Sequence, residues 1–302
     1  DQPVKWPVAG FYFKPVLVLL NIAPFWAMLV LFARLLDREA KTEWTWTYSL
    51  FAAAFGTYLL PYAQTLNNHT IAASSAFFAL YVLVRIWDDG AVQPWRFALL
   101  GLLAGFTATC ELPAFAFLGL LGLALLARFP AKTLAWFAPA ALAPVVAMVA
   151  CQYAALGEFK LPYEEFGGEA YAYEGSLWKT PLELDALNVP WLDPEEAARR
   201  GIAKESYAKY LFHMTLGHHG FWSSTPIFLF ALIGLIRLLK PGNRLNAAAW
   251  LTLALTAILL AFYTWNPKAR NYGGSAQGLR WLFWLIPFWL LMLAAGLDAV
   301  AS

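Results

Sequence analysis

The stretch from Thr133 to Tyr153 reads TLAWFAPAALAPVVAMVACQY, which is 21 residues without one charged side chain. A helix needs about 20 such apolar residues to cross a hydrocarbon core of roughly 30 Å. Apolar stretches of similar kind recur along the chain, which is 61% hydrophobic and only 13% charged. An average soluble domain carries about 25% charged residues. The sequence therefore predicts an all-α, polytopic transmembrane helical bundle.

Nine membrane spans are expected from the apolar stretches. Strict alternation of apolar and polar residues is absent, which argues against a membrane barrel. The fourth and fifth spans are short and meet at Glu111, so they form either two helices or one long kinked helix. The nine spans are Val16–Leu36, Trp44–Tyr62, Ile71–Trp87, Phe97–Cys110, Pro113–Ala127, Thr133–Tyr153, Pro226–Leu239, Ala247–Tyr263 and Leu282–Ala299.

Lys and Arg are shared unequally between the two sets of short loops. Because cytoplasmic loops carry the excess of these residues, the richer set is expected in the cytoplasm. Residues 1–15 then lie outside, and the C-terminus lies inside. An outside start without a signal peptide leads us to expect one more helix upstream of Asp1. The richer set is Arg34, Arg38, Lys41, Arg85, Arg96, Arg128, Lys132, Arg237, Lys240 and Arg244, and the poorer set is Lys5, Lys14, Lys268, Arg270 and Arg280.

The long polar segment 158–223 divides the chain into three parts. Residues 1–157 hold the first six spans, 158–223 form an extracytoplasmic loop, and 224–302 hold the last three spans. This loop carries eleven of the nineteen carboxylates and ends in an amphipathic stretch, Tyr207–Leu216, which is expected to lie along the membrane surface. The loop could also dock a protein partner. The net charge of +2 favours no particular partner, and no basic arm for nucleic acid is present.

Polar residues concentrate on the predicted outer side. Asn68 and His69 lie in an uncharged turn between the second and third spans, where Asn68 or Thr70 can cap the following helix. Glu111 lies between two apolar runs. A carboxylate at membrane depth usually faces a polar cavity or a partner; alternatively it lies at the water interface, paired with an arginine of the last outer loop. These residues are therefore candidates for substrate binding, with a structural role as the alternative.

Two adjacent histidines, His218 and His219, stand between glycines before the seventh span. Glycine permits the turn that two neighbouring histidines need in order to bind one metal ion. Contact with a polar or anionic substrate and a purely structural role are the other two interpretations.

The last outer loop carries Arg270, Tyr272 and Arg280, together with three glycines that allow close backbone approach. Arginine matches phosphate in a two-pronged geometry, and the free N–H groups at the start of the ninth helix add positive potential. Positive charge on the side where it is disfavoured indicates an anionic partner, either a phosphate-bearing substrate or the lipid headgroups themselves.

Taken together, four motifs resemble a group of bacterial inner-membrane proteins related to the GT-C glycosyltransferases, which include protein O-mannosyltransferases and the aminoarabinose transferase acting on lipid A. The resemblance covers most of the chain, and the glycine-rich loop with its arginine is the most specific part. The motifs are Asn-Asn-His-Thr (67–70), Glu-Leu-Pro (111–113), Gly-His-His-Gly (217–220) and Asn-Tyr-Gly-Gly…Gly-Leu-Arg-Trp (271–281).

The resemblance implies transfer of a sugar from a polyprenyl-phosphate carrier to an acceptor at the outer face of the membrane. Such enzymes keep their catalytic carboxylate in the loop after the first helix and often need a divalent cation. This sequence lacks that loop, so no general base is assigned. A transporter or lipid flippase, or a non-catalytic subunit of a membrane complex, remains the alternative.

Overall fold

The computed structural model describes residues 8–159, 206–265 and 278–301, and within these ranges the chain forms helices and no strand. Prolines open several helices, where the N–H that proline lacks is not needed. The helices are α1 (Val8–Leu17), α2 (Ala23–Glu39), α3 (Glu43–Phe55), α4 (Leu59–Ala63), α5 (Asn68–Trp87), α6 (Pro94–Cys110), α7 (Phe115–Arg128), α8 (Pro130–Lys132), α9 (Ala138–Leu156), α12 (Tyr207–Thr215), α13 (Phe228–Leu238), α14 (Asn246–Trp265) and α15 (Ile286–Ala301), with π-helical turns η1 (Val18–Ile22) and η3 (Thr133–Phe137) and 3-10 turns η2 (Leu112–Ala114) and η8 (Arg280–Leu285).

Five helical segments in the described ranges are long and apolar enough to cross a membrane. The chain is therefore a helical membrane protein, as its composition predicts. Two of the remaining predicted spans coincide with shorter apolar helices, Leu112–Arg128 and Phe228–Leu238, and the count of nine spans stays a prediction. The five segments are Phe11–Glu39, Asn68–Trp87, Pro130–Leu156, Asn246–Trp265 and Arg280–Ala301.

The predicted second span is wrong as a single helix, because the chain breaks between α3 and α4. Gly56 ends α3, and the hydroxyl of Thr57 accepts a hydrogen bond from the Leu59 N–H over 3.3 Å. The 13 residues of α3 extend for about 20 Å. The short helix α4 then leads the chain into the turn before α5.

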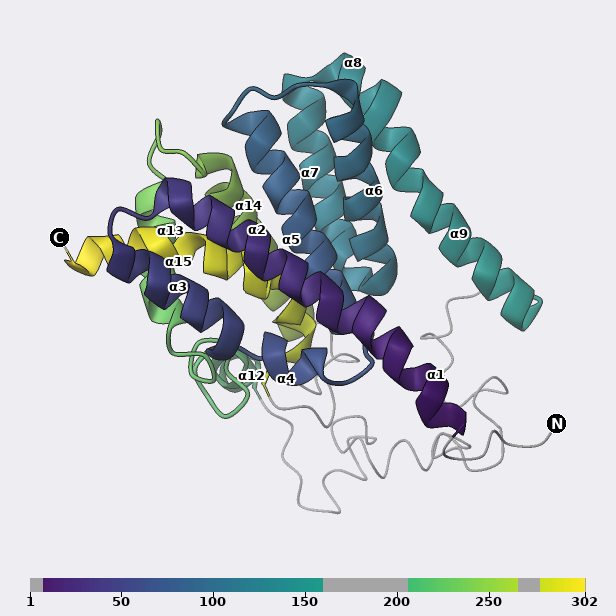
Figure 1. Cartoon of the computed structure of the whole chain (residues 1–302), viewed down its shortest axis with the longest axis horizontal. Coiled ribbons are helices and arrows are strands. Elements are labelled where there is room, and N and C mark those ends of the chain that lie inside the picture. Colours follow the sequence, from purple (N-terminus) through teal and green to yellow (C-terminus); the bar gives the residue numbers. More distant parts are fainter. Residues whose placement is uncertain (1–7, 160–205, 266–277, 302) are drawn as a thin grey trace.

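The helices form two groups that meet at α15 (Figure 1). In one group α5, α6, α7 and α9 stand side by side, and in the other α2, α3 and α13 pack around α15. The segment from Leu282 to Ala294, from η8 into α15, is buried throughout and forms the centre of the core. Because α6 and α7 lie side by side, the fourth and fifth predicted spans are two helices and not one kinked helix.

Glycines allow the closest helix contacts. A Cβ on Gly234 would overlap the main-chain oxygen of Met292, and a Cβ on Gly296 would overlap that of Phe230, so α13 and α15 touch backbone to backbone. Gly101 serves the same purpose between α6 and η3. Small residues are the usual means by which helices associate in lipid, where apolar side chains gain little from leaving the solvent.

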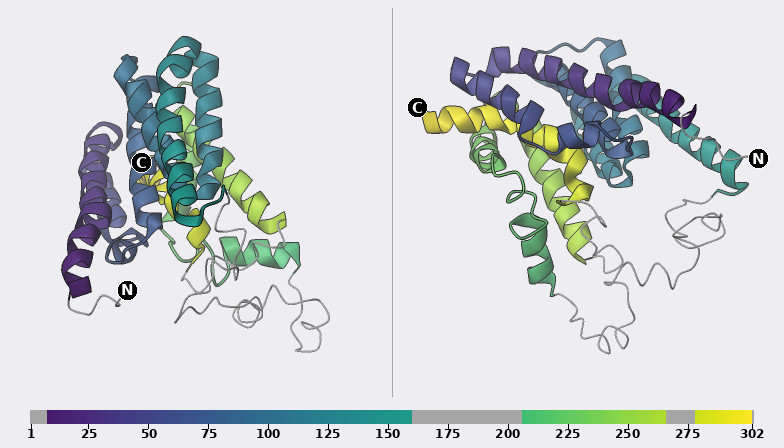
Figure 2. Two further views of the ribbon diagram at one scale, coloured as in Figure 1. Left: turned by 90° about the vertical axis from the view of Figure 1, so that its right-hand side faces the viewer. Right: turned by 60° about the horizontal axis from the view of Figure 1, so that its bottom comes forward.

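The helix α12 confirms that the stretch after residue 206 is helical and amphipathic. It buries Tyr210 and Met214 and exposes Leu211 and Phe212. It contacts α14, and in the left view of Figure 2 it runs roughly at right angles to the upright helices. Most of the predicted extracytoplasmic loop, residues 160–205, lies outside the described residues.

The bundle has two polar ends, named here after residues of α5 and the turn that follows it. The His69 end is where α5 begins. The Asp89 end is where α5 stops, and there the Asp89 carboxylate pairs with Arg38 at 2.5 Å, Arg85 at 2.7 Å and Arg244 at 2.8 Å. All three arginines belong to the set predicted to share the cytoplasmic side, and the structure brings them together.

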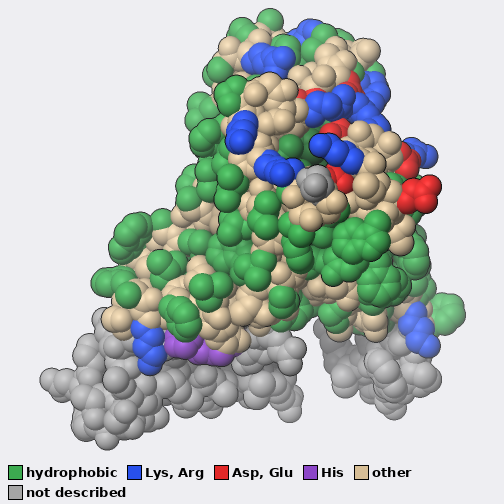
Figure 3. All heavy atoms as spheres, turned by 90° about the vertical axis from the view of Figure 1, so that its left-hand side faces the viewer, with side chains coloured by type: hydrophobic (Ala, Val, Ile, Leu, Met, Phe, Trp, Pro, Cys, Tyr) green, Lys and Arg blue, Asp and Glu red, His purple; other side chains and the backbone are tan. Residues whose placement is uncertain are grey.

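Apolar side chains cover much of the surface between these ends. In Figure 3 charged side chains gather over the upper part of the face and apolar side chains cover the part below. Trp26, Leu123 and Val146 are each at least 60% exposed. Exposed apolar surface on this scale marks an interaction with a membrane or a partner, and the long apolar helices identify it as lipid-facing.

Candidate functional site

The turn that opens α5 is held by Asn67. Its Oδ1 accepts a hydrogen bond from the Thr70 N–H over 2.8 Å, and its Nδ2 donates to the Tyr62 carbonyl over 2.7 Å. The predicted cap, Asn68 or Thr70, is therefore corrected to Asn67. Asn67 has extended backbone before the first helical residue, which is the conformation that lets a side chain reach the free N–H groups. The side chain of Asn68 is left to make other contacts.

Asn68 joins the start of α5 to the end of α6. Its Nδ2 donates to the Cys110 carbonyl over 2.7 Å and to Glu111 Oε1 over 3.1 Å. Glu111 has an extended backbone (φ −135°), and Pro113 lies in the 3-10 turn that reverses the chain into α7. This local break in the helix directs the carboxylate toward α5 and not along the axis of α6.

His69 contacts the same carboxylate oxygen through its Nδ1. The two side chains are only 13% and 7% exposed, respectively. Within the described part of the chain the carboxylate of Glu111 is bound by His69 and Asn68, and Arg280 makes no ion pair with it. The interpretation of Glu111 as a carboxylate with a polar partner is supported, since a buried carboxylate needs hydrogen bonds to offset its lost hydration.

Asn21 fixes this turn from the first long helix, and sequence reasoning missed it. It is fully buried, and its Nδ2 donates to the Asn67 carbonyl over 3.1 Å. Its Oδ1 has no hydrogen-bond partner among the described residues. Asn21 lies in the π-helical turn η1, a feature that often marks functional positions. The available signal was one amide, Asn21, in the otherwise apolar stretch 16–33 of the predicted first span.

Aromatic rings link the His69–Glu111 pair to the last loop. The ring centre of His69 lies 6.2 Å from that of Tyr62 and 6.1 Å from that of Phe283, and the latter two rings are 4.5 Å apart. Tyr62 belongs to α4 and Phe283 to η8. The pair is thus screened from solvent by rings from two segments far apart in the sequence.

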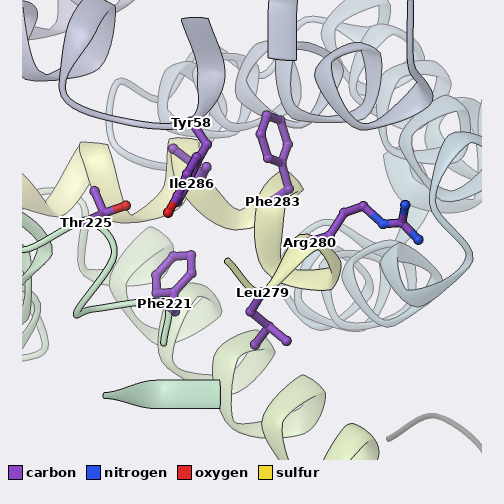
Figure 4. A pocket seen from close by; sticks show the side chains of 7 residues that line it. All are labelled: Tyr58, Phe221, Thr225, Leu279, Arg280, Phe283 and Ile286. Carbon is purple, nitrogen blue, oxygen red and sulfur yellow. The ribbon is translucent and has the colours of Figure 1, made fainter. Parts of the chain in front are cut away.

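Arg280 begins η8 at the same end of the bundle. Its Nε is buried without a hydrogen-bond partner among the described residues. Arg280 lines a small hollow together with Phe283, the ring that lies next to His69. In Figure 4 the guanidinium points away from Thr225. Arg280 is thus a cation without an anionic partner in the described part of the chain, in the same neighbourhood as the buried carboxylate.

A small hollow of about 10 Å³ lies beside Arg280 (Figure 4). That volume holds roughly one water molecule, so this hollow by itself does not enclose a space the size of a sugar. Gly278, with φ 72°, passes close to the ring of Tyr58 at the same place, as expected for a glycine that permits close backbone approach. The hollow is lined by Tyr58, Phe221, Thr225, Leu279, Arg280, Phe283 and Ile286.

The paired histidines form a second cluster, in the turn after α12. The ring centre of His218 lies 4.1 Å from that of His213 and 4.5 Å from that of His219. Within the described ranges no group of three His, Cys, Asp or Glu residues is arranged to hold a metal ion. Phe221 and Thr225, which follow these histidines, line the hollow beside Arg280, so the cluster borders the same end of the bundle.

The structure therefore unites only part of the predicted site. Asn68, His69 and Glu111 are in direct contact, and Arg280 begins the turn η8, whose Phe283 packs beside His69. Arg270 and Tyr272 lie outside the described residues.

Fold and site define a helical membrane protein with a buried carboxylate–imidazole pair at one end, together with an arginine that has no anionic partner among the residues described. No protein-family model, curated protein or solved structure matches the chain.

Proposed function

We propose that the protein is a GT-C-like membrane glycosyltransferase, which moves a sugar from a polyprenyl-phosphate carrier to an acceptor at the extracytoplasmic face. The observation that carries the proposal is the contact between His69 and Glu111, next to the ring of Phe283 in the turn that Arg280 begins. The pair offers hydrogen-bonding groups for a sugar or an acceptor. The guanidinium of Arg280, which pairs with no carboxylate in the described ranges, offers positive charge for a phosphate.

The sidedness of the proposal follows from the charges. Arg38, Arg85 and Arg244 meet at Asp89, and membrane proteins keep Lys and Arg mainly in the cytoplasm. The Asp89 end is then cytoplasmic and the His69 end faces outward. Polyprenyl-phosphate sugars would be used on that outward side, as the resemblance to GT-C enzymes implies.

The roles of the residues follow from the reaction. An acceptor oxygen attacks the sugar carbon that bears the carrier phosphate, and the bond between that carbon and the phosphate oxygen breaks. Arg280, together with Arg270 of the same loop, would hold the departing phosphate and stabilise its growing negative charge. His69, Asn68 and Glu111 would position the sugar or the acceptor hydroxyl. The acceptor proton would pass to a carboxylate base, which the resemblance places in the loop after the family's first helix.

A proton-coupled transporter is less favoured by the placement of charge. Such proteins carry ionisable residues deep within the membrane. The buried acidic or basic side chains of the described residues are Glu111 and Asp298. They lie at opposite ends of the bundle, since Asp298 accepts a hydrogen bond from the Lys41 N–H. A non-catalytic subunit would need no buried carboxylate–imidazole pair.

The direct test is a transfer assay with the intact membrane protein and a radiolabelled sugar on a polyprenyl-phosphate carrier. Wild type and two exposed-residue controls, Lys14→Ala and Glu43→Gln, should transfer label, whereas Glu111→Gln should transfer about tenfold less or worse. Absence of transfer by wild type from mannosyl, glucosyl and aminoarabinosyl carriers would count against the enzyme, as would equal rates for all variants.

A further inference from the structure

A second cavity, at the Asp89 end, has a volume of about 260 Å³. This is close to the lower end, about 300 Å³, of ordinary ligand pockets. It lies between the turn after α2, the end of α13, the following loop, and α15, and Figure 3 looks onto this end, where Lys and Arg gather around a hollow. Its lining residues are Glu39, Lys41, Arg237, Leu238, Asn243, Arg244, Leu245, Leu291, Ala294, Ala295 and Asp298.

The two carboxylates of the cavity are already bound. Asp298 accepts hydrogen bonds from the Lys41 N–H over 3.1 Å and from the Thr45 hydroxyl over 2.6 Å. Glu39 accepts one from Arg244 Nε over 3.0 Å. The acidic groups are therefore satisfied by the protein and leave no free carboxylate to attract a cation.

Two cationic side chains of the cavity form no ion pair within the described residues. The side chains of Lys41 and Arg237 make no ion pair with any described residue, whereas Arg244 is shared between Glu39 and Asp89. Lys41 and Arg237 belong to segments almost 200 residues apart, and the fold brings them to one cavity. Two unpaired cations on one polar wall favour an anion, and arginine favours a phosphate that it can bind through two N–H groups.

The opposite wall and the outer surface are apolar. Leu291 and Ala294 of α15 line the cavity. Ile233, one helical turn before Arg237 and on the same face of α13, is 39% exposed, and Ile236 is 60% exposed. A cationic pocket that opens beside lipid-facing side chains suits a molecule with an anionic head and an apolar tail.

We propose that this cavity binds the phosphate headgroup of an anionic phospholipid, with Lys41 and Arg237 on the phosphate and an acyl chain along α13. The site lies at the opposite end of the bundle from His69 and Glu111, so it stands whether or not the protein transfers sugars. The bound phosphate would bridge Arg237 of α13 and Lys41 of the turn after α2. It would thereby stabilise the packing of both segments against α15.

The test measures binding of short-chain phosphatidylglycerol to the purified full-length protein, with short-chain phosphatidylcholine and inorganic phosphate as separate probes. The Kd for phosphatidylglycerol should weaken on the order of tenfold or more in Lys41→Gln/Arg237→Gln. It should be unchanged in the matched double variant Arg34→Gln/Lys240→Gln, which removes two exposed cations outside the cavity, and largely retained in Lys41→Arg/Arg237→Lys.

Each other outcome overturns the proposal. Equal affinity of the two double Gln variants would show that general charge, and not this cavity, attracts the lipid. Inorganic phosphate that binds as tightly as phosphatidylglycerol would assign the cavity to a free anion. If the wild type binds phosphatidylglycerol and phosphatidylcholine with equal affinity, the cavity does not recognise an anionic headgroup.

Discussion

The side chain of Asn21 donates a hydrogen bond over 3.1 Å to the main-chain carbonyl of Asn67, which lies 46 residues further along the chain. Through this bond the first long helix holds the turn that carries Asn68 and His69. Asn21 is buried, and buried polar groups are retained where they are hydrogen-bonded. The bond therefore connects a π-helical turn in one helix to the geometry of the candidate site in another.

Replacing Asn21 with Leu, which is similar in size, should lower the free energy of unfolding by about 0.5–1.5 kcal/mol, because the Asn67 carbonyl loses its donor. Thermal unfolding in detergent measures the change. Gln64→Leu removes an exposed amide of the same neighbourhood and should have little effect. Equal melting temperatures for the two variants would show that the hydrogen bond contributes nothing.

His69 and Glu111 should be energetically coupled, because removing the histidine leaves a buried carboxylate short of partners. A double-mutant cycle with His69→Gln, Glu111→Gln and the double variant should give a coupling of about 0.5–3 kcal/mol in unfolding free energy. The double variant is expected to be more stable than His69→Gln alone. Additive effects of the two substitutions would mean that the contact is energetically irrelevant.

Arg280→Ala should weaken binding of a polyprenyl phosphate by about tenfold or more, since the proposed phosphate contact is lost. Lys14→Ala is the matched control, because Lys14 is exposed on α1. Titration of the carrier lipid into the purified protein provides the two dissociation constants. The assignment of Arg280 to the phosphate fails if the two variants bind with the same affinity.

Gly296→Ala should destabilise the bundle by about 1–3 kcal/mol, because the new methyl group would overlap the main chain of Phe230 and push α13 from α15. Gly119→Ala, on an open face of α7, should be neutral or stabilising by up to about 1 kcal/mol, since alanine favours helix. Thermal unfolding of both variants measures the two changes in stability. A loss of stability in Gly119→Ala alone would contradict the packing between α13 and α15 described above.

The ion pairs of Asp89 with Arg38, Arg85 and Arg244 should make the free energy of unfolding depend on pH. The hydrogen bond from Arg38, followed by that from Arg244, lowers the pKa of Asp89 from 3.8 to about 2. Because the folded pKa lies below the unfolded one, the stabilisation is fully present above the unfolded pKa and is lost as the pH falls toward the folded pKa. It amounts to at most about 2.5 kcal/mol, and solvent around the arginines reduces it.

The measurement is the melting temperature of wild type and Asp89→Asn at a series of pH values. The wild type should be the more stable at pH 7, and the gap should close between roughly pH 4 and pH 2. Glu43→Gln removes an exposed carboxylate without an ion pair in the described ranges and should show no such gap. A difference between wild type and Asp89→Asn that is constant with pH would contradict the role of the charge.

The helices were easier to predict than their ends. Spans such as Ala247–Tyr263 coincide with a helix, here α14, because long uncharged runs have no alternative in lipid. The break after Phe55 was missed, since Gly56 and Thr57 interrupt an otherwise apolar run without any charge. The cap at Asn67 was assigned to its neighbour, because helix ends depend on backbone conformation that the sequence shows only to within one or two residues.

Hydropathy is a property of each segment by itself, and for that reason the sequence alone determined that this chain is helical and lies in a membrane. The uneven distribution of Lys and Arg along the sequence further predicts that one end of the bundle carries more of these residues than the other. Which polar groups meet is decided by the way the helices return on one another. His69 and Glu111 are 42 positions apart in the sequence, and Asn21 and Asn67 are 46 positions apart. The members of each pair meet only because α5 and α6 pair as a hairpin and the first helix crosses its end. Only the tertiary structure, therefore, could show that Glu111 is bound by His69 while Arg280 is left without an anion in the described part of the chain.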